Sequence, residues 1–116
     1  MEFRELQAID AVPAAQWNAL AGTTCPFLRH EFLAALEHTG CVGPGTGWTP
    51  AHLAAFDGDR LRAAAPAYRK QHSWGEFVFD FSWAQAYARH GLAYYPKLLV
   101  AVPFSPINST RLLVAP

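Results

Sequence analysis

The densest group of chemically competent side chains lies at residues 72–83, in the sequence HSWGEFVFDFSW. Aromatic residues alternate there with His72, Glu76 and Asp80. A carboxylate can act as a general base, and aromatic walls can shape a substrate groove. The competing interpretation places the aromatics in the core and uses the carboxylates to cap a helix or face water. We take Glu76 and Asp80 as candidate catalytic residues and His72 as a candidate substrate-binding residue.

Two patterns further along the chain extend this candidate site. Trp83 and Tyr87 stand four residues apart, which places them on one face of a helix. The sequence YYPK at 94–97 precedes an apolar run, and its hydroxyls and ammonium could orient a polar substrate. Amphipathic residues at the start of a strand would show the same composition. We take Trp83, Tyr87 and Lys97 as further candidate substrate-binding residues.

Four metal-ligating residues, Cys25, His30, His38 and Cys41, fall in one short stretch. Zinc sites usually pair their ligands at C-x2–4-C and H-x3–5-H spacing. Here the spacings are Cys-x4-His and His-x2-Cys, and the histidines flank a helical pattern. We therefore expect ordinary helix-surface histidines and small apolar cysteines, and we assign no metal site. Cys25 is not an expected nucleophile either, because no orienting third group accompanies it.

The glycines at 43–47, in the sequence GPGTG, superficially resemble a phosphate-binding loop. Such a loop needs a strand before it and a helix after it, so that the helix N-terminus faces the anion. Here a helical pattern precedes the glycines and a strand pattern follows them. We predict a connecting loop over Cys41–Pro50.

Composition narrows the class of protein. Nine Lys and Arg balance nine Asp and Glu, and only 16% of the 116 residues are charged, against roughly 25% in an ordinary soluble domain. The zero net charge disfavours a nucleic-acid binder, and no apolar run approaches the ~18–20 residues of a membrane span. Without an export signal, the two cysteines are expected to be reduced thiols in the cytoplasm. The low charge indicates either a surface that something else covers or a piece of a larger protein.

Periodicity predicts a mixture of helices and strands. We expect a strand over Phe3–Ile9, a short helix from Pro13, and a second helix that ends at Gly40. Asp57-Gly58 between the apolar runs His52–Phe56 and Leu61–Ala67 predicts a hairpin, with Leu61, Ala63, Ala65 and Ala67 on one face. Pro66 suggests a sheet edge or a bulge.

The second half of the chain adds a helix and a strand. Ser82 and Gln85 match a capping box, which predicts a helix ending at Gly91. The continuous apolar run Lys97–Val102 is typical of a central strand buried on both faces. The fold class is therefore α+β, a mixed arrangement with a central mixed or antiparallel sheet and flanking helices.

Several segments resemble one bacterial family, the FemAB-like proteins of peptidoglycan biosynthesis or recognition, which are grouped with the GNAT N-acyltransferases. The segments are CPFLRHEFL (25–33), GCVGPGTGWTP (40–50), HSWGEFVFD (72–80), YARHG (87–91) and YYPKLLVAVPFSP (94–106). The resemblance implies that residues 1–116 form the N-terminal portion of the first GNAT-like unit. It implies a parent protein that transfers an acyl or aminoacyl group to an amine of a cell-wall precursor.

The resemblance also sets an expectation about cofactor and partners. A GNAT fold holds the acyl-CoA pyrophosphate after its central strand, on a Gln/Arg-x-x-Gly-x-Gly/Ala pattern, whereas residues 103–111 read PFSPINSTR without a glycine. The resemblance therefore implies acyl-CoA as a possible cofactor of the parent protein and none for residues 1–116, and we expect the 116-residue chain to be inactive alone. The alternative is a non-catalytic module that binds a peptide or glycan, or that self-associates. We expect a homo-oligomer or a C-terminal unit to cover the open side of Lys97–Val102.

Overall fold

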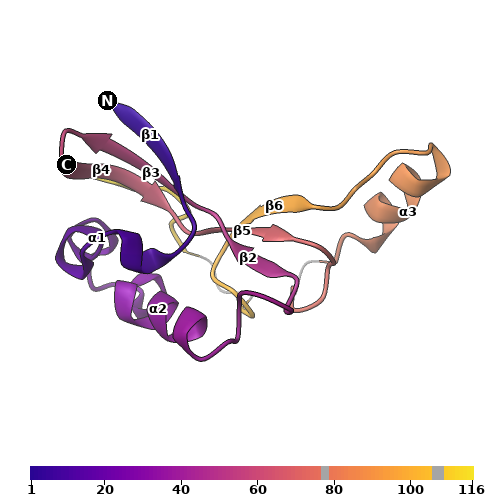
Figure 1. The fold of residues 1–116 in the computed structure, drawn as a ribbon, viewed down its shortest axis with the longest axis horizontal. Coiled ribbons are helices and arrows are strands. Elements are labelled where there is room, and N and C mark those ends of the chain that lie inside the picture. Colours follow the sequence, from indigo (N-terminus) through magenta and orange to yellow (C-terminus); the bar gives the residue numbers. More distant parts are fainter. Residues whose placement is uncertain (77–78, 106–108) are drawn as a thin grey trace.

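The computed structural model describes residues 1–76, 79–105 and 109–116, and these form two antiparallel sheets and three α-helices. The α+β class predicted from the sequence is confirmed. The first sheet has the order β1 (Glu2–Leu6), β3 (His52–Asp57), β4 (Arg60–Ala65), β7 (Leu113–Val114), and the second has the order β2 (Trp48–Pro50), β5 (Ala67–Lys70), β6 (Lys97–Val100). The helices are α1 (Ala14–Ala21), α2 (His30–His38) and α3 (Phe81–Arg89) (Figure 1).

The β3–β4 hairpin turns where Asp57-Gly58 predicted it, and Gly58 has the positive φ of 63° that such a turn requires. The strand register shifts between Ala55 and Phe56, so Phe56 pairs with Leu61 whereas Ala55 pairs with Ala63. This bulge turns Leu61 into the core together with Ala64. The predicted common face of Leu61 and Ala63 is therefore wrong, because strict alternation does not cross a bulge.

Two neighbouring segments of the chain continue from one sheet into the other and form a bent, paired ribbon. Strand β2 runs into β3 through Ala51, and β4 runs into β5 through Pro66. The Ala51 amide donates to the Ala67 carbonyl over 2.9 Å, which keeps the ribbon paired where the chain changes sheets. Pro66 has no amide hydrogen for a ladder, so it falls at the strand break, as its ring chemistry predicts.

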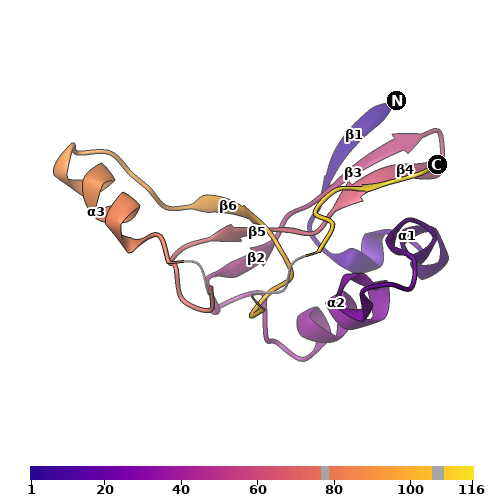
Figure 2. The same ribbon diagram turned by 180° about the vertical axis from the view of Figure 1, so that it is seen from behind.

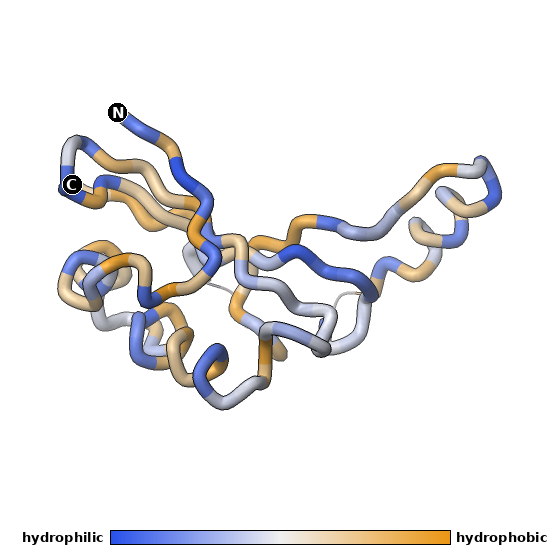
Figure 3. The backbone as a smooth tube through the Cα atoms, in the orientation of Figure 1, coloured by the Kyte–Doolittle hydropathy of each residue, from blue (hydrophilic) through white to orange (hydrophobic). Residues whose placement is uncertain are grey.

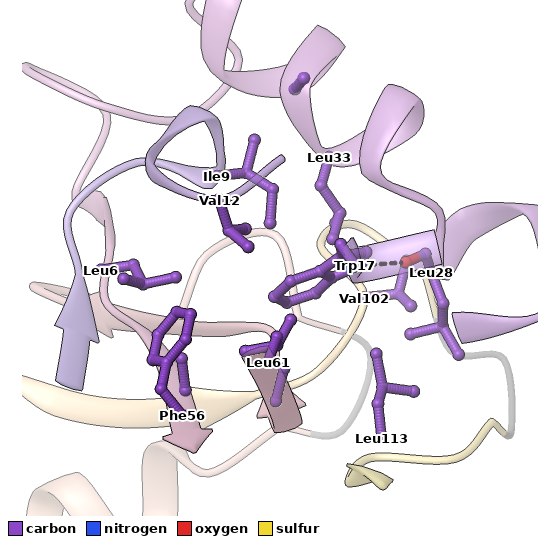
Figure 4. Packing of buried hydrophobic residues seen from close by; sticks show 13 residues of the cluster. Leu6, Ile9, Val12, Trp17, Leu28, Leu33, Phe56, Leu61, Val102 and Leu113 are labelled. Atoms are coloured by element: carbon purple, nitrogen blue, oxygen red, sulfur yellow. Dashed lines mark hydrogen bonds between the residues drawn. The ribbon is translucent and has the colours of Figure 1, made fainter. Parts of the chain in front are cut away.

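Helices α1 and α2 lie on one face of the first sheet and bury the main core against it (Figure 1). Trp17 is at its centre, fully buried, and its indole N–H donates to the Leu28 carbonyl over 2.8 Å (Figure 4). Leu33 from α2 and Phe56 and Leu61 from the sheet complete the contact. Burying each such side chain contributes roughly 1.5–3 kcal/mol.

A buried polar group ties these layers together. The Glu37 carboxylate of α2 accepts the Ile9 amide hydrogen at 2.9 Å and the His52 Nε2 hydrogen at 2.9 Å. His52 is fully buried, and its Nδ1 accepts the Ala67 amide hydrogen over 3.2 Å. Both ring nitrogens and the tautomer of His52 are thus fixed by structure.

The opposite face of the first sheet has no helix on it among the described residues. Figure 3 shows mostly hydrophobic colours along β3 and β4, whereas β1 is largely hydrophilic. Phe3, Leu53 and Val114 are exposed on that face, beside a groove of about 460 Å³ lined by small alanines. The sheet is therefore apolar on both sides and covered on one.

Helix α3 stands apart from α1 and α2, at the far end of a molecule about 45 Å long (Figures 1 and 2). It begins at Phe81 with Asp80 as its N-cap residue, and no side-chain cap bond forms there. The predicted Ser82–Gln85 capping box is therefore wrong, because Asp80 rather than Ser82 precedes the helix and the Asp80 carboxylate is used elsewhere.

Three strand predictions also need correction. The first strand ends at Leu6 rather than Ile9, and Trp48–Pro50, predicted as loop, is strand β2 paired with β5. Strand β6 pairs only with β5, so it is the edge of the second sheet, and Leu98 is exposed. The predicted central position of Lys97–Val102 is wrong because an apolar run does not reveal whether a strand has one neighbour or two.

Candidate functional site

The ammonium group of Lys97 lies in a ring of oxygen acceptors. Its Nζ donates to Ser73 Oγ at 3.0 Å, to Glu76 Oε1 at 2.9 Å and to Asp80 Oδ2. The rings of Tyr94 and Tyr95 stand 5.6 and 5.9 Å from the same nitrogen, within cation–π range. A lysine ammonium has three hydrogens to donate, so these acceptors satisfy it completely. We call this arrangement of Ser73, Glu76, Asp80, Tyr94 and Tyr95 the ammonium cage.

A second lysine, Lys70, contacts the cage through Glu76. Lys70 is fully buried, and its Nζ donates to Glu76 Oε2 at 2.7 Å and to the Trp74 carbonyl at 2.9 Å. The same nitrogen lies 3.9 Å from the centre of the Trp48 ring. Glu76 thus joins the two lysines with one oxygen each, which fixes the orientation of its carboxylate.

Asp80 is the part of the cage whose hydrogen bonding is least complete. Its Oδ2 accepts from Lys97 and from the Tyr94 hydroxyl at 2.6 Å, whereas its buried Oδ1 has no partner among the described residues. Burial acts to raise the pKa of Asp80, but hydrogen bonds from Lys97, Ser73 and Tyr94 outweigh it and lower this pKa to about 2. Asp80 is therefore a carboxylate at any pH near neutrality.

The pKa values of Lys97 and Tyr94 are raised, whereas that of Lys70 is lowered. Burial acts to lower the pKa of Lys97, but its bonds to Asp80 and Glu76 outweigh this and raise the pKa. The bond to Asp80 raises the pKa of Tyr94 to about 12, since the phenol must remain protonated to donate. Burial lowers the pKa of Lys70, although Glu76 opposes the change. The cage therefore holds two lysines against two carboxylates.

Sheet pairing brings these residues together. Lys70 ends β5 and Lys97 begins β6, and the two are register partners. Two ammonium groups on neighbouring strands would repel each other. The turn after β5 and the start of α3 supply Glu76 and Asp80 between them, which converts the repulsion into an ion-pair network.

Of the six predicted site residues, the structure brings Glu76, Asp80 and Lys97 into direct contact. Tyr87 lies next to the cage, with the centre of its ring 5.0 Å from that of Tyr94. Trp83 is 67% exposed.

His72 belongs to a different contact. Its Nε2 donates to the Thr46 carbonyl at 2.9 Å and its Nδ1 accepts the Trp74 amide hydrogen at 3.1 Å. The ring packs against Gly47, where a Cβ atom would overlap it. Both nitrogens are occupied by backbone, so His72 holds two loops together.

Sequence reasoning missed Lys70 and Ser73. The strand alternation carried a signal for Lys70, because it shares a face with the buried Tyr68 two residues earlier. Ser73 carried none, since its role depends on contacts with Tyr95 at 2.6 Å and with Lys97, both distant in sequence.

Neither a metal nor acyl-CoA finds a site in the part of the chain described. No group of three or more His, Cys, Asp or Glu there could hold a metal ion. His30 bonds the Ile9 and Val12 carbonyls instead, and both cysteines are free thiols. After β6 the described residues form a turn and then β7, with no helix whose N-terminus could receive a pyrophosphate.

Comparison with known proteins places this architecture in a family. The fold and the cage define an α+β protein with an ion-pair site shaped around an ammonium group. A family model, FemAB-like, described as peptidoglycan biosynthesis/recognition, matches residues 8–116. The chain belongs to the FemAB-like family, as its sequence segments predicted, and its role therefore concerns peptidoglycan. No curated protein and no solved structure matches it.

None of the helices within residues 1–76, 79–105 and 109–116 has the length and apolar character needed to cross a bilayer.

Proposed function

We propose that this chain recognises the acceptor amine in a FemAB-like acyl or aminoacyl transferase that acts on a cell-wall precursor. The observation that carries the proposal is the ammonium cage. Three oxygens and two tyrosine rings surround a primary ammonium, which in this structure is the chain's own Lys97. A primary amine of a precursor, protonated before reaction, presents the same group.

The cage suits binding better than proton removal. An efficient general base has a pKa near the working pH, whereas the pKa of Asp80 is about 2. Glu76 uses both oxygens on lysines. We therefore assign these two candidate residues to holding an ammonium by charge-assisted hydrogen bonds. Tyr87 and Tyr94 form the aromatic side of the acceptor groove.

Exchange of amines explains how an occupied cage can act as a site. Lys97 lies on the edge strand β6, and its side chain is 14% exposed. A precursor amine that enters the cage takes the acceptors of Lys97 while that lysine moves outward into solvent. No acid or base has to change its protonation state for this exchange.

The transfer itself would need groups outside these residues. The parent protein would use acyl-CoA or another activated acyl donor, for which the described residues offer no fitting site. We therefore propose that the 116-residue chain alone has little or no transferase activity, and that it works in the cytoplasm with a further unit or a second copy.

Calorimetry with a stem peptide tests this function. The probe is a peptidoglycan stem peptide with a free side-chain amine, and its matched control is the same peptide with that amine acetylated. Saturable binding of the free amine, at least tenfold tighter than the acetylated form, is expected because acetylation removes the charge. Equal binding of both peptides, or robust acyl transfer from acetyl-CoA by this chain, would refute the proposal.

Two variants locate the binding. Tyr94→Phe removes only the hydroxyl that holds Asp80 and should weaken binding of the free amine roughly tenfold or more, since one hydrogen bond to a charged group contributes about 1.5–3 kcal/mol. Asp59→Asn, in the β3–β4 turn, is the control and should leave the affinity unchanged. Unfolding temperatures of both variants show whether a loss reflects folding.

A second candidate is a non-catalytic module that self-associates, and the open face of the first sheet favours it. Phe3, Leu53 and Val114 expose apolar surface there. Monomeric proteins rarely leave a wide apolar patch uncovered. Light scattering that shows a concentration-dependent dimer would support this candidate, and a monodisperse monomer at moderate concentration would count against it.

A further inference from the structure

Helix α3 has an apolar stripe that no other helix or strand of the described chain buries, although the Tyr87 ring on it contacts Tyr94. At about 100° per residue, Trp83, Ala84, Tyr87 and Ala88 fall on one side of the helix, and Ser82, Gln85 and Arg89 on the other. An amphipathic helix in a globular protein normally buries its apolar stripe. None of the residues of α3 is buried, and Trp83 is 67% exposed.

The helix is carried outward on an arm, which we define as residues 81–96. Figures 1 and 2 show α3 at the end of the molecule opposite α1 and α2, with the returning segment leading back to β6. Leu92, on that segment, is 59% exposed. The arm therefore presents Trp83 and Leu92 where a large flat surface could reach them.

The charge of the arm indicates which kind of surface it could bind. Residues 81–96 contain no Asp or Glu, and their charged or titratable cationic side chains are Arg89 and His90. Both are exposed and stand at the end of α3. Tryptophan and tyrosine side chains beside a basic residue favour the interface between lipid headgroups and acyl chains.

We propose that the arm docks on an anionic lipid bilayer, with Trp83 and Leu92 entering the headgroup region and Arg89 on the lipid phosphates. The uncovered apolar stripe gives the attraction to the interface, and the absence of acidic residues removes the repulsion that an anionic surface would otherwise exert. This inference uses none of the ion pairs of the ammonium cage, although Tyr94 and Tyr95 belong to both the arm and the cage.

Vesicle flotation tests the docking. The full chain is mixed with vesicles of phosphatidylcholine alone or with phosphatidylglycerol added, and the bound fraction is measured. Binding should be stronger to the anionic vesicles. Arg89→Gln should weaken that binding about fivefold and leave binding to neutral vesicles unchanged. The double variant Trp83→Ser, Leu92→Ser should weaken it roughly tenfold or more.

Phe3→Ser provides the matched control, because Phe3 is 80% exposed but lies on the first sheet, away from the arm. It should bind vesicles as the wild type does. Since α3 has no buried residue, the arm variants should keep the unfolding temperature of the wild type. Failure of the wild type to bind anionic vesicles, or an equal loss in Phe3→Ser, would overturn the proposal. So would a dimer that the arm variants abolish in the absence of lipid.

Discussion

Lys70 is the residue whose replacement should disturb the candidate site most. Lys70→Met leaves Glu76 Oε2 and the Trp74 carbonyl without their donor in a buried place. Removing one partner of a buried ion pair costs about 3–5 kcal/mol. We expect a loss of stability of this order in chemical denaturation.

The neighbouring Arg69 is the control for that experiment. Its pair with Glu5 is solvent-exposed, so Arg69→Met should cost less than about 1 kcal/mol. The double variant Lys70→Met, Glu76→Gln should recover part of the loss, because it leaves no buried charge unpaired. Equal costs for Lys70→Met and Arg69→Met would show that the buried pair is unimportant.

Asp80 gives the site a defined response to acid. Its pKa falls from 3.8 to about 2 in the folded chain, so its contribution is complete above about pH 4 and is lost as the pH falls through 2. The expected contribution is on the order of 1 kcal/mol, since solvent screens part of the ion pair. Asp80→Asn should therefore narrow the stability difference between pH 5 and pH 2, whereas Asp59→Asn should not.

At the scale of single residues, the sequence identified the charged residues of the site but not the hydrogen bonds and ion pairs between them. Glu76, Asp80 and Lys97 stood out because charged residues are rare in this chain and these lie among aromatics. The bridging role of Glu76 could not be foreseen, because it depends on Lys70 and Lys97 being register partners on different strands.

Among the elements, the loop before β2 depends on a single close contact. Gly45 and Gly47 have similar positive φ angles of 83° and 76°, but only at Gly47 would a Cβ meet the His72 ring. Gly45→Ala should cost about 1 kcal/mol from backbone strain alone. Gly47→Ala should cost about 1–3 kcal/mol more from overpacking.

Thermal and chemical unfolding of the two alanine variants measures this difference. His72→Ala in the Gly47→Ala background should remove the extra cost, since it removes the ring that the methyl group meets. Indistinguishable stabilities of Gly45→Ala and Gly47→Ala would contradict the packing of His72 described above.

Glu37 shows how a helix is held to a sheet by polar contacts. Glu37→Gln keeps the shape, but in either orientation its NH2 group faces a donor at 2.9 Å, the Ile9 amide at the Oε1 position or His52 Nε2 at the Oε2 position. Leaving one buried donor unsatisfied should cost about 1–3 kcal/mol. Glu31→Gln, on the exposed side of the same helix, should change stability by less than about 0.5 kcal/mol. A larger effect at Glu31 would contradict this assignment.

The elements were predictable where a local signal fixes them. Asp57-Gly58 selects the hairpin, and the four-residue spacing of Phe32 and Leu36 falls within α2. The edge position of β6 was not predictable, because the run from Lys97 to Val102 has the same composition in an edge strand as in a central one. The N-cap residue of α3 is Asp80 rather than the predicted Ser82, and the Asp80 carboxylate bonds Lys97 and Tyr94 instead of capping the helix.

At the scale of the whole molecule, the low charge noted in the sequence has a structural counterpart. Apolar side chains are exposed on the outer face of the first sheet and on the arm, at opposite ends of the molecule. Composition indicated that some surface would be covered, but it could not say where. In the described chain, helices cover only one side of the first sheet, and no helix lies beside α3. Apolar side chains therefore remain exposed at these two places.

Chemical rescue tests most directly whether the site recognises an ammonium group. Lys97→Ala removes the side chain that fills the cage and leaves Glu76 and Asp80 facing an empty space. Added n-butylammonium should raise the unfolding temperature of Lys97→Ala in a saturable manner, because it returns the charge and three donors to the cage. The wild type should respond much less, because its own Lys97 competes for the same acceptors, and the variant should not respond to n-butanol. No rise with the amine, or the same rise in the wild type, would contradict the proposed amine recognition.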